Sequence, residues 1–465
     1  MNKLVDRFII VLLVCTPFIA FANTYRVGAT RTYTVPSAVS PLVNNGDTVL
    51  IDAGEYVGDV CSWRANNLLL RGEGLVILRA NGKAAEQKAI WVVKGNDCVI
   101  DGIDFRDCAV PDRNGAGIRV EGTNITVQRC AFRKNQDGIL AGDNRTSTIT
   151  VEYCEFDRSG AGDGLSHAIY VNHVRRFIFR YNYSHGTLVG HEFKSRALET
   201  FIAYNRISNE DGTGSRNIDL PNGGTSVIIG NVIQHGPNAE NGNVIGYGLE
   251  GMVDTVANNL TVAYNTIVNE RSSATFIRAD TNTKILRLVN NLIAGNGTLL
   301  IGDAADVDTL HNLRSMRIAD VMFTNAAQYD YRLLETSPAR LAALDVWNDL
   351  QVTPTYSYRH VTGRTERRTA RDLGAYESDK TASVDVTNET DIGSVTPLPA
   401  SSFITLHLPM SVRGLPSSVI GVDGRTIAML GIAAEEDLRI NVQAYPPGLY
   451  TIVCGRVNVP FIVAR

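Results

Sequence analysis

Short runs in which apolar and polar residues alternate recur along much of the chain, and each is followed by Asn or Cys and a second apolar pair. The runs begin at Ile125, Ile149, Phe177, Thr200, Ser226, Leu260 and Leu286 and repeat every 23 to 34 residues. Alternation with a period of two predicts β-strands, and helical periodicity is absent from this region. We therefore expect each repeat to be one coil of a parallel β-solenoid, with coils stacked about 4.8 Å apart.

The position that follows each run is polar in one coil after another. It is occupied by Cys130 and Cys154 and then by Asn182, Asn205, Asn231, Asn265 and Asn291. Stacked side-chain amides would bond along the stack and satisfy polar groups at a tight turn. We expect an internal asparagine ladder preceded by stacked, buried thiols. None of the six cysteines beyond residue 22 forms a CxxC pair, so a zinc knuckle is not expected.

Residues near the two ends of the repeat region carry a family resemblance. GDTVLIDAGEY from Gly46, the repeated runs, and RDLGAYE from Arg371 resemble the secreted right-handed parallel β-helix superfamily, which includes pectate-lyase-like proteins. The resemblance covers about residues 24–377 and implies an all-β solenoid over residues 23–377. The sequence also predicts a short helix from Pro36 to Asn44 over the open end of this solenoid. It does not fix the activity, because the superfamily contains lyases, hydrolases, epimerases and noncatalytic adhesins.

The two termini differ in character from the repeat region. Residues 1–22 predict an export signal, with Lys3 and Arg7 before a short apolar run and cleavage before Asn23. Residues 378–400 have the composition of a linker. Residues 401–465 predict a small β-sandwich that is similar to the C-terminal sorting domains of type IX secretion cargo, on VDGR from Val422 and PPGLY from Pro446. A carbohydrate-binding or bracing sandwich is the alternative.

The charge pattern limits the partners. The net charge is −4, with both signs mixed along the chain, so there is no basic stripe that would bind nucleic acid. After the export signal, no apolar stretch is long enough to span a membrane. We expect a secreted or cell-surface monomer whose partners are an acidic polysaccharide and, through the C-terminal domain, the secretion machinery.

A second set of strands lies between the ladder runs and carries the candidate chemistry. Ile118, Ile139, Ile169, Phe193, Ile218 and Ile245 align as one inward column. By strand alternation, the next residue of each strand points outward. Consecutive coils then bring Tyr170, Lys194 and Asp219 within about one strand spacing, with Asn172 and Arg196 beside them. Glu192 and Asn217 are assigned to the outward position before this column.

Further polar residues border this face. His167, His191 and Arg216 begin the same three strands and are placed at the turn edge, because Arg216 cannot lie unpaired in a core. Tyr247 and Glu250 border the group one coil later, and Asn222 completes the expected substrate-binding set. Three other histidines are expected to be exposed at strand ends or turns: His173, His185 and His235.

This set of residues suits β-elimination of a uronate polysaccharide. That reaction needs a neutralised carboxylate, a base for the neighbouring proton and an acid for the leaving oxygen. Arg196 or Arg216 would clamp the carboxylate, and Lys194 would be the base if nearby cations favoured its neutral form. Tyr170, His167 or His191 would act as acid or alternative base. The resemblance implies Lys or Arg catalysis with calcium or a cationic side chain as the neutraliser. No dense Asp/Glu set predicts a calcium site, so metal dependence stays open.

Other functions fit parts of the same pattern. A glycoside hydrolase would use Glu192 and Asp219, which the expected register places about 8 Å apart, within the inverting range. A uronate epimerase would need the same clamp, base and acid as a lyase. A glycan-binding surface solenoid would need no catalysis. In the simplest structural interpretation, Glu192, Lys194 and Asp219 form a cross-strand salt-bridge ladder of small energetic value.

Overall fold

The computed structural model describes residues 22–252, 257–344, 354–367, 371–378, 394–396, 400, 402–407, 416–421, 426–432, 437–454 and 457–463. The chain divides into two compact units, Met1–Ser378 and Asp379–Arg465. The expected export signal, apart from Ala22, and the VDGR motif lie outside the described residues. No helix among those residues has the length and apolar character needed to cross a membrane.

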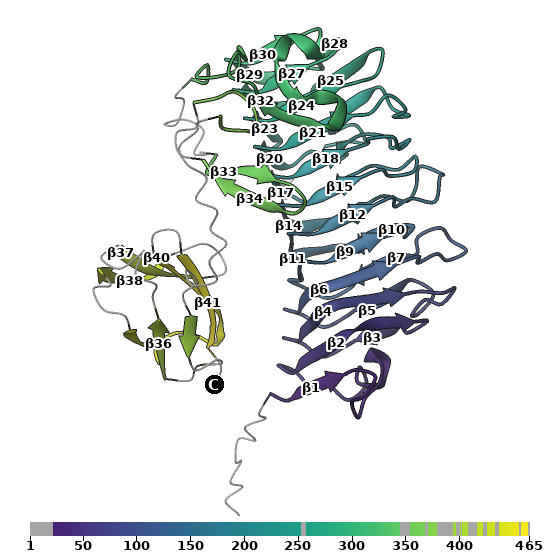
Figure 1. Cartoon of the computed structure of the whole chain (residues 1–465), viewed down its shortest axis with the longest axis vertical. Coiled ribbons are helices and arrows are strands. Elements are labelled where there is room, and N and C mark those ends of the chain that lie inside the picture. Colours follow the sequence, from purple (N-terminus) through teal and green to yellow (C-terminus); the bar gives the residue numbers. More distant parts are fainter. Residues whose placement is uncertain are drawn as a thin grey trace, which may run out of the picture. The chain divides into compact units, whose positions relative to one another are not determined.

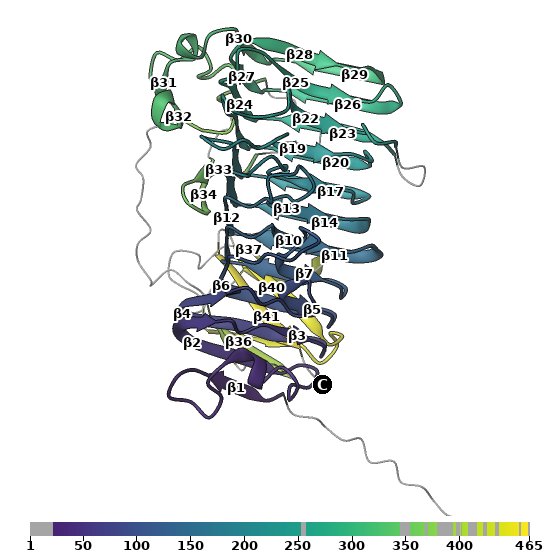
Figure 2. The same cartoon turned by 90° about the vertical axis from the view of Figure 1, so that its right-hand side faces the viewer.

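The first unit is a right-handed parallel β-helix with three faces, which confirms the expected fold class (Figures 1 and 2). Face 1 contains β1 (Thr24–Val27), β2 (Thr48–Val57), β4 (Leu69–Arg79), β6 (Val99–Arg106), β8 (Thr126–Gln128), β11 (Asn144–Glu152), β14 (Val174–Arg180), β17 (Glu199–Ala203), β20 (Thr225–Ile229), β23 (Asn259–Ala263), β26 (Thr283–Val289) and β29 (Ala304–Leu310). Face 2 contains β9 (Ala131–Arg133), β12 (Glu155–Asp157), β15 (Tyr183–His185), β18 (Arg206–Ser208), β21 (Val232–His235), β24 (Thr266–Asn269), β27 (Leu292–Ala294) and β30 (Leu313–Ser315).

Face 3 is a separate ten-stranded parallel sheet. Its strands are β3 (Cys61–Trp63), β5 (Ala89–Val93), β7 (Ala116–Val120), β10 (Asp137–Ala141), β13 (Ile169–Val171), β16 (Lys194–Ser195), β19 (Ile218–Leu220), β22 (Asn243–Tyr247), β25 (Ala274–Ala279) and β28 (Gly297–Ile301). The expected isoleucine column lies in register, with Ile139 opposite Ile169 and Ile218 opposite Ile245. These side chains are fully buried, so the alternating pattern of the sequence directs one side of every strand into the core.

The asparagine ladder is present at the corner between faces 1 and 2. The Asn205 amide oxygen accepts hydrogen bonds from the Asn182 backbone N–H at 2.8 Å and from its side-chain amide at 3.1 Å. The same pattern continues along the stack and extends to Asn312. Cys154 and Cys130 precede the ladder as buried thiols outside any disulfide, and the Cys154 thiol contacts Cys130. Both features are as expected from the sequence.

The ends of the β-helix differ from expectation at one point. The helix expected from Pro36 to Asn44 is only the single 3-10 turn η1 (Pro36–Ala38), because turns follow it directly. After β30, the chain folds back over face 2. This extension contains η2 (Ile318–Val321), β31 (Phe323–Asn325), η3 (Ala326–Gln328), β32 (Asp330–Leu333), and a hairpin of β33 (Tyr356–Arg359) and β34 (Gly363–Glu366). It leaves face 3 uncovered by any of its own strands.

The second unit is a small β-sandwich, as expected. One sheet contains β35 (Ser394–Thr396), β36 (Phe403–His407) and β39 (Asp437–Asn441); the other contains β37 (Pro416–Gly421), β38 (Thr426–Ile432), β40 (Gly448–Cys454) and β41 (Val457–Val463). Ile404 and Leu406 of the first sheet share a buried core with Ile452 and Phe461 of the second. Within the PPGLY motif, the Tyr450 hydroxyl donates to the Pro446 carbonyl at 2.7 Å.

Candidate functional site

The expected outward column exists on face 3. Tyr170 on β13 pairs with Lys194 on β16, and Lys194 pairs with Asp219 on β19. The next residue of the column is Gly246 on β22, which carries no side chain to cover Asp219. A Cβ atom at Gly246 would lie 3.1 Å from an Asp219 carboxylate oxygen and 2.9 Å from Arg216 Cδ. The small residue at this coil therefore leaves room for the charged groups of the coil before it.

Three cations and two carboxylates lie close together here: Lys194, Arg196, Arg216, Asp219 and Glu250. We call these five residues and Tyr170 the Lys194 cluster. The Lys194 ammonium lies 3.6 Å from Asp219 Oδ2 and 3.4 Å from Glu250 Oε1. On the other side of Asp219, the Arg216 guanidinium donates to Oδ1 at 2.9 Å. The Asp219 side chain is only 1% exposed, whereas that of Glu250 is 46% exposed. Asp219 thus lies at the buried base of the cluster, and Glu250 lies at its solvent-exposed edge.

Arg196 is held by three partners at once. Its Nε–H donates to the Tyr170 hydroxyl at 2.8 Å, one Nη donates to the Asn222 side-chain oxygen at 2.5 Å, and the other donates to Glu250. Lys194 and Arg196 also lie over the Tyr170 ring, at 5.3 and 5.8 Å from its centre. Because the Tyr170 oxygen accepts from Arg196, its own hydroxyl hydrogen remains available for another acceptor.

His167 and His191 stack at the edge of the cluster, with ring centres 4.8 Å apart and planes 7° from parallel. The His191 backbone N–H donates to His167 Nδ1 at 3.0 Å, and the Arg216 backbone N–H donates to His191 Nδ1 at 3.1 Å. Each Nδ1 is therefore unprotonated, and a neutral ring carries its hydrogen on Nε2. Burial, together with the nearby positive charge of Lys194, lowers the pKa of both rings well below the ordinary value. His191 thus presents an Nε2–H to Asp219, whose Oδ2 is 3.4 Å away.

The environments of the two carboxylates shift their pKa values in opposite directions. Burial raises the pKa of Asp219, and the charges of Arg216 and Lys194 offset this only in part. Burial acts more weakly on Glu250, so the hydrogen bond from Arg196 and the charge of Lys194 lower its pKa. Three buried polar atoms here have no hydrogen-bond partner among the described residues: Asp219 Oδ2, Arg216 Nε and Asn172 Oδ1. Such atoms are uncommon in folded proteins.

Two expected site residues lie inside the coil. Glu192 is fully buried and accepts hydrogen bonds from the Thr187 N–H and hydroxyl at 3.0 and 2.7 Å. It precedes β16, so strand alternation does not apply to it, and the inverting pair of Glu192 and Asp219 is wrong. Asn217, assigned outward with it, is buried as well. Tyr247 is buried opposite Leu220, and its hydroxyl donates to the Gly224 carbonyl, so it does not border the site.

The structure also changes two expected roles. Lys194 was expected to act as a base among cations, but its ammonium lies between two carboxylates, those of Asp219 and Glu250. It therefore suits charge neutralisation better than proton removal. His167 and His191 have their Nδ1 atoms occupied by backbone N–H groups, so they suit hydrogen-bond donation better than base catalysis.

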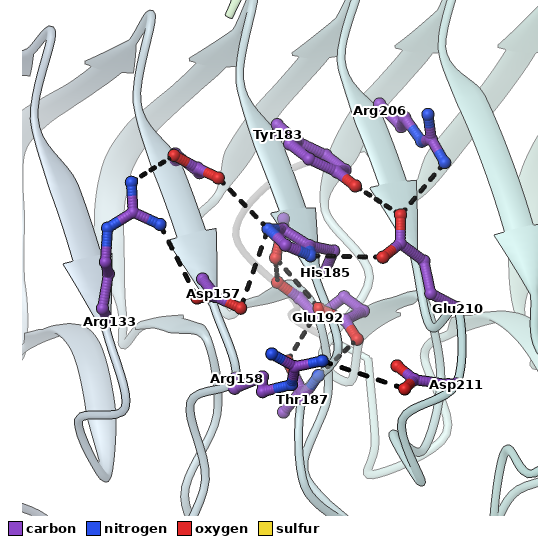
Figure 3. A network of polar contacts seen from close by, with 12 residues as sticks. Arg133, Asp157, Arg158, Tyr183, His185, Thr187, Glu192, Arg206, Glu210 and Asp211 are labelled. Carbon is purple, nitrogen blue, oxygen red and sulfur yellow. Dashed lines mark hydrogen bonds and ion pairs between the residues drawn. The ribbon is translucent and has the colours of Figure 1, made fainter. Parts of the chain in front are cut away.

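A second polar network lies on face 2 and was not expected. His185, predicted to be exposed, lies 3.4 Å from both Glu155 and Glu210 and stacks on Tyr183 (Figure 3). Burial alone would lower the pKa of His185, but hydrogen bonds to Glu155 and Glu210 raise it to about 9. Asp157 lies directly opposite His185 in the sheet. An alignment of the outward residues of the ladder strands would therefore have predicted the Asp157 and His185 pair. His235 is also buried, bonded to Asn217 and the Asn241 carbonyl.

No group of three or more His, Cys, Asp or Glu side chains within the described part of the chain is arranged to hold a metal ion. A groove of about 550 Å³ lies beside the hairpin of β33 and β34 and is lined in part by Arg129, Tyr153, Glu155 and Val361. This groove shares no residue with the Lys194 cluster. The cluster lies on face 3, where the Glu250 side chain is 46% exposed and those of Lys194 and Arg196 are 11% and 15% exposed.

The match to one family model agrees with the fold over part of the chain. Residues 42–168 match the family described as "Right handed beta helix region". No curated protein matches the chain. Among solved structures, the chain is similar to a pectin methylesterase from Aspergillus niger, with 11% identity, 70% of this chain and 93% of that chain covered, and a TM-score of 0.27. A likeness at that level carries no argument about fold or activity.

Proposed function

We propose that this protein is a secreted lyase that cleaves a uronate-containing polysaccharide by β-elimination. The observation that carries the proposal is the meeting of Lys194, Arg196 and Arg216 beside the Tyr170 hydroxyl on an open face. An elimination next to a carboxylate builds negative charge on that carboxylate, and fixed cations stabilise it without reorganisation. The three cations exceed the two carboxylates of the cluster, so its formal charge is positive when the histidines are neutral.

Each chemical requirement has a candidate group. Lys194 and Arg196 would bind the substrate carboxylate. After its hydroxyl hydrogen has passed to solvent, the Tyr170 oxygen would take the proton from the carbon next to that carboxylate. As the carbon–carbon double bond forms and the carbon–oxygen bond breaks, the reformed hydroxyl would give the proton to the leaving oxygen. The proton is conserved, and the two cations beside Tyr170 stabilise negative charge on its oxygen during the transfer.

The eliminated product absorbs ultraviolet light, which gives a direct test. The purified protein is incubated with a panel of uronate polymers while absorbance is followed. We expect an active polymer, and a loss of at least about a hundredfold in turnover in Tyr170→Phe. The matched control is Tyr153→Phe, which removes the same atom on the other side of the molecule, beside the hairpin groove. Absence of an unsaturated product with every polymer would reject the proposal, as would full activity of Tyr170→Phe.

One observation favours glycoside hydrolysis as a second candidate. Asp219 and Glu250 contact the same ammonium, and their pKa values are shifted apart, as in an acid and base pair. Hydrolysis would produce new reducing ends without new ultraviolet absorbance, so the same incubations separate the two reactions.

We also propose that the protein is exported and that residues 401–465 address it to a type IX-like secretion route. The resemblance of VDGR and PPGLY to sorting domains supports this proposal. Deleting the C-terminal unit should leave the protein inside the producing cell, as shown by fractionation. Unchanged export of the shortened chain would assign that unit a binding or bracing role instead.

A further inference from the structure

Glu250 lies where an incoming acidic ligand would be expected to bind. Its carboxylate contacts the Lys194 ammonium at 3.4 Å and accepts a hydrogen bond from the Arg196 guanidinium. The two cations are largely buried, with 11% and 15% of their side chains exposed, whereas Glu250 is 46% exposed. The cations therefore belong to the wall of the site, and the carboxylate covers them from the solvent side.

The backbone around Glu250 is fixed, so its side chain is the part that can leave. The Glu250 N–H donates to the Pro221 carbonyl, and the Asn222 side chain donates to the Gly251 carbonyl, each at 2.9 Å. Gly248 and Gly251 flank the turn with φ values of 76° and 103°, which other residues rarely adopt. A half-exposed ion pair contributes little free energy, so a competing anion can replace it.

We propose that Glu250 is an internal stand-in for the substrate carboxylate, and that a negatively charged uronate must displace it to bind. The proposal rests on the proposed function and names its substrate class as the free acid. A methyl-esterified uronate has no charge to exchange for that of Glu250, so Lys194 and Arg196 would stay paired with Glu250 in its presence. The same residue would then reject neutral sugars and select charged ones.

The anchoring of Arg196 supports this assignment. Its contacts with Tyr170 and Asn222 do not involve Glu250, so the guanidinium keeps its position when Glu250 leaves. A substrate carboxylate in the place of the Glu250 carboxylate would be bound by Lys194 and by the guanidinium that also holds the Tyr170 hydroxyl. The carbon that loses its proton would then lie beside the proton-transfer group, which is what pre-organised catalysis requires.

The test compares Glu250→Gln with the intact full-length protein. Glu240→Gln is the matched control, because it removes the same charge from an exposed residue outside the cluster. The probes are short oligomers of galacturonate, of mannuronate and guluronate, and of glucuronate, each as the acid and as the methyl ester. Affinities are measured by calorimetry at low salt, and thermal unfolding checks that the variants are folded.

We expect Glu250→Gln to bind the acidic oligomer about threefold to tenfold more tightly, with little change for the ester and no change in Glu240→Gln. Unchanged or weaker acid binding in Glu250→Gln would overturn the proposal and make Glu250 a structural or substrate-binding residue. Absence of acid binding to both proteins would overturn it as well. Tighter acid binding without an unsaturated product from any polymer would instead reject the lyase and keep the stand-in.

Discussion

Glu192 is a buried carboxylate whose ionisation should limit the stability of the protein at neutral pH. It is fully buried and accepts hydrogen bonds from Thr187, Ser184 and Asn209, but no cation lies among these partners. Burial raises its pKa from the ordinary 4.5 to about 7, although the Thr187 hydrogen bonds act against this. We predict that replacing it by Gln removes a pH-dependent loss of stability.

The sign and size of this change in stability follow from the pKa of Glu192 in the unfolded chain and in the folded protein. Below the unfolded pKa, both states hold the proton and Glu192 costs nothing. As pH rises from 4.5 to about 7, the unfolded state releases its proton first, so the free energy of unfolding falls. Since one pKa unit corresponds to about 1.4 kcal/mol, the loss is about 3 kcal/mol above pH 7. Gln does not titrate, and the hydroxyls of Thr187 and Ser184 can rotate to accept from its amide.

Urea unfolding of both proteins, followed by circular dichroism from about pH 4 to about pH 8, measures this difference. The stability of Glu192→Gln relative to the unaltered protein should rise by about 3 kcal/mol across that range. Asp137, whose pKa burial also raises to about 7, titrates in both proteins and cancels in the comparison. Glu240→Gln, an exposed equivalent, should show no such rise. Parallel pH profiles for Glu192→Gln and the unaltered protein would refute the reasoning.

Two further predictions concern the ladder and the second network. Asn205→Ala removes the bonds to the Asn182 N–H and the Phe179 carbonyl and should cost about 2–4 kcal/mol in urea unfolding, whereas Asn238→Ala, on the surface, should cost little. His185 has a raised pKa, so its stabilisation is complete below 6.5 and is lost as pH rises through about 9. The fall of the thermal midpoint in that window should therefore be smaller in His185→Gln than in the unaltered protein, and a fall equal to that of the unaltered protein would contradict the assigned ion pairs.

The sequence predicted the parts of the site that obey strand alternation. Tyr170, Lys194 and Asp219 each follow an inward residue of the column (Ile169, Phe193 and Ile218) by one position, and the register places them side by side. The rule placed Glu192 on the wrong side, because Glu192 lies in a turn, where successive side chains need not point to opposite faces. Tyr247 obeys alternation, since it lies two residues after the inward Ile245, so a consistent use of the rule would have placed it in the core.

Groups joined across several coils could not be found in this way. Glu250 was predicted to border the site, but its ion pairs with Lys194 and Arg196 were not, because Glu250 lies in a turn 54 to 56 residues later and no periodic pattern specifies the direction of a turn side chain. His185 was predicted to be exposed at a strand end, but Asp157 is its partner in the neighbouring strand and two further carboxylates contact its ring. The Nδ1 contacts of the two stacked histidines depend on the path of the backbone between coils, which residue types alone do not encode.

The hairpin of β33 and β34 alters how this solenoid resists unravelling. In a simple stack, each coil contacts only its neighbours, so coils can fray from an end one at a time. Here Arg364 donates to the Tyr181 hydroxyl at 2.9 Å, and Tyr356 packs against both Tyr181 and Tyr204. These contacts join the late hairpin to coils in the middle of the stack. The hairpin thus attaches a late part of the chain to the middle of the stack. It can dock only after the middle coils have formed. Late-formed contacts of this kind slow unfolding more than they speed folding, so the docked hairpin would lengthen the lifetime of the folded protein.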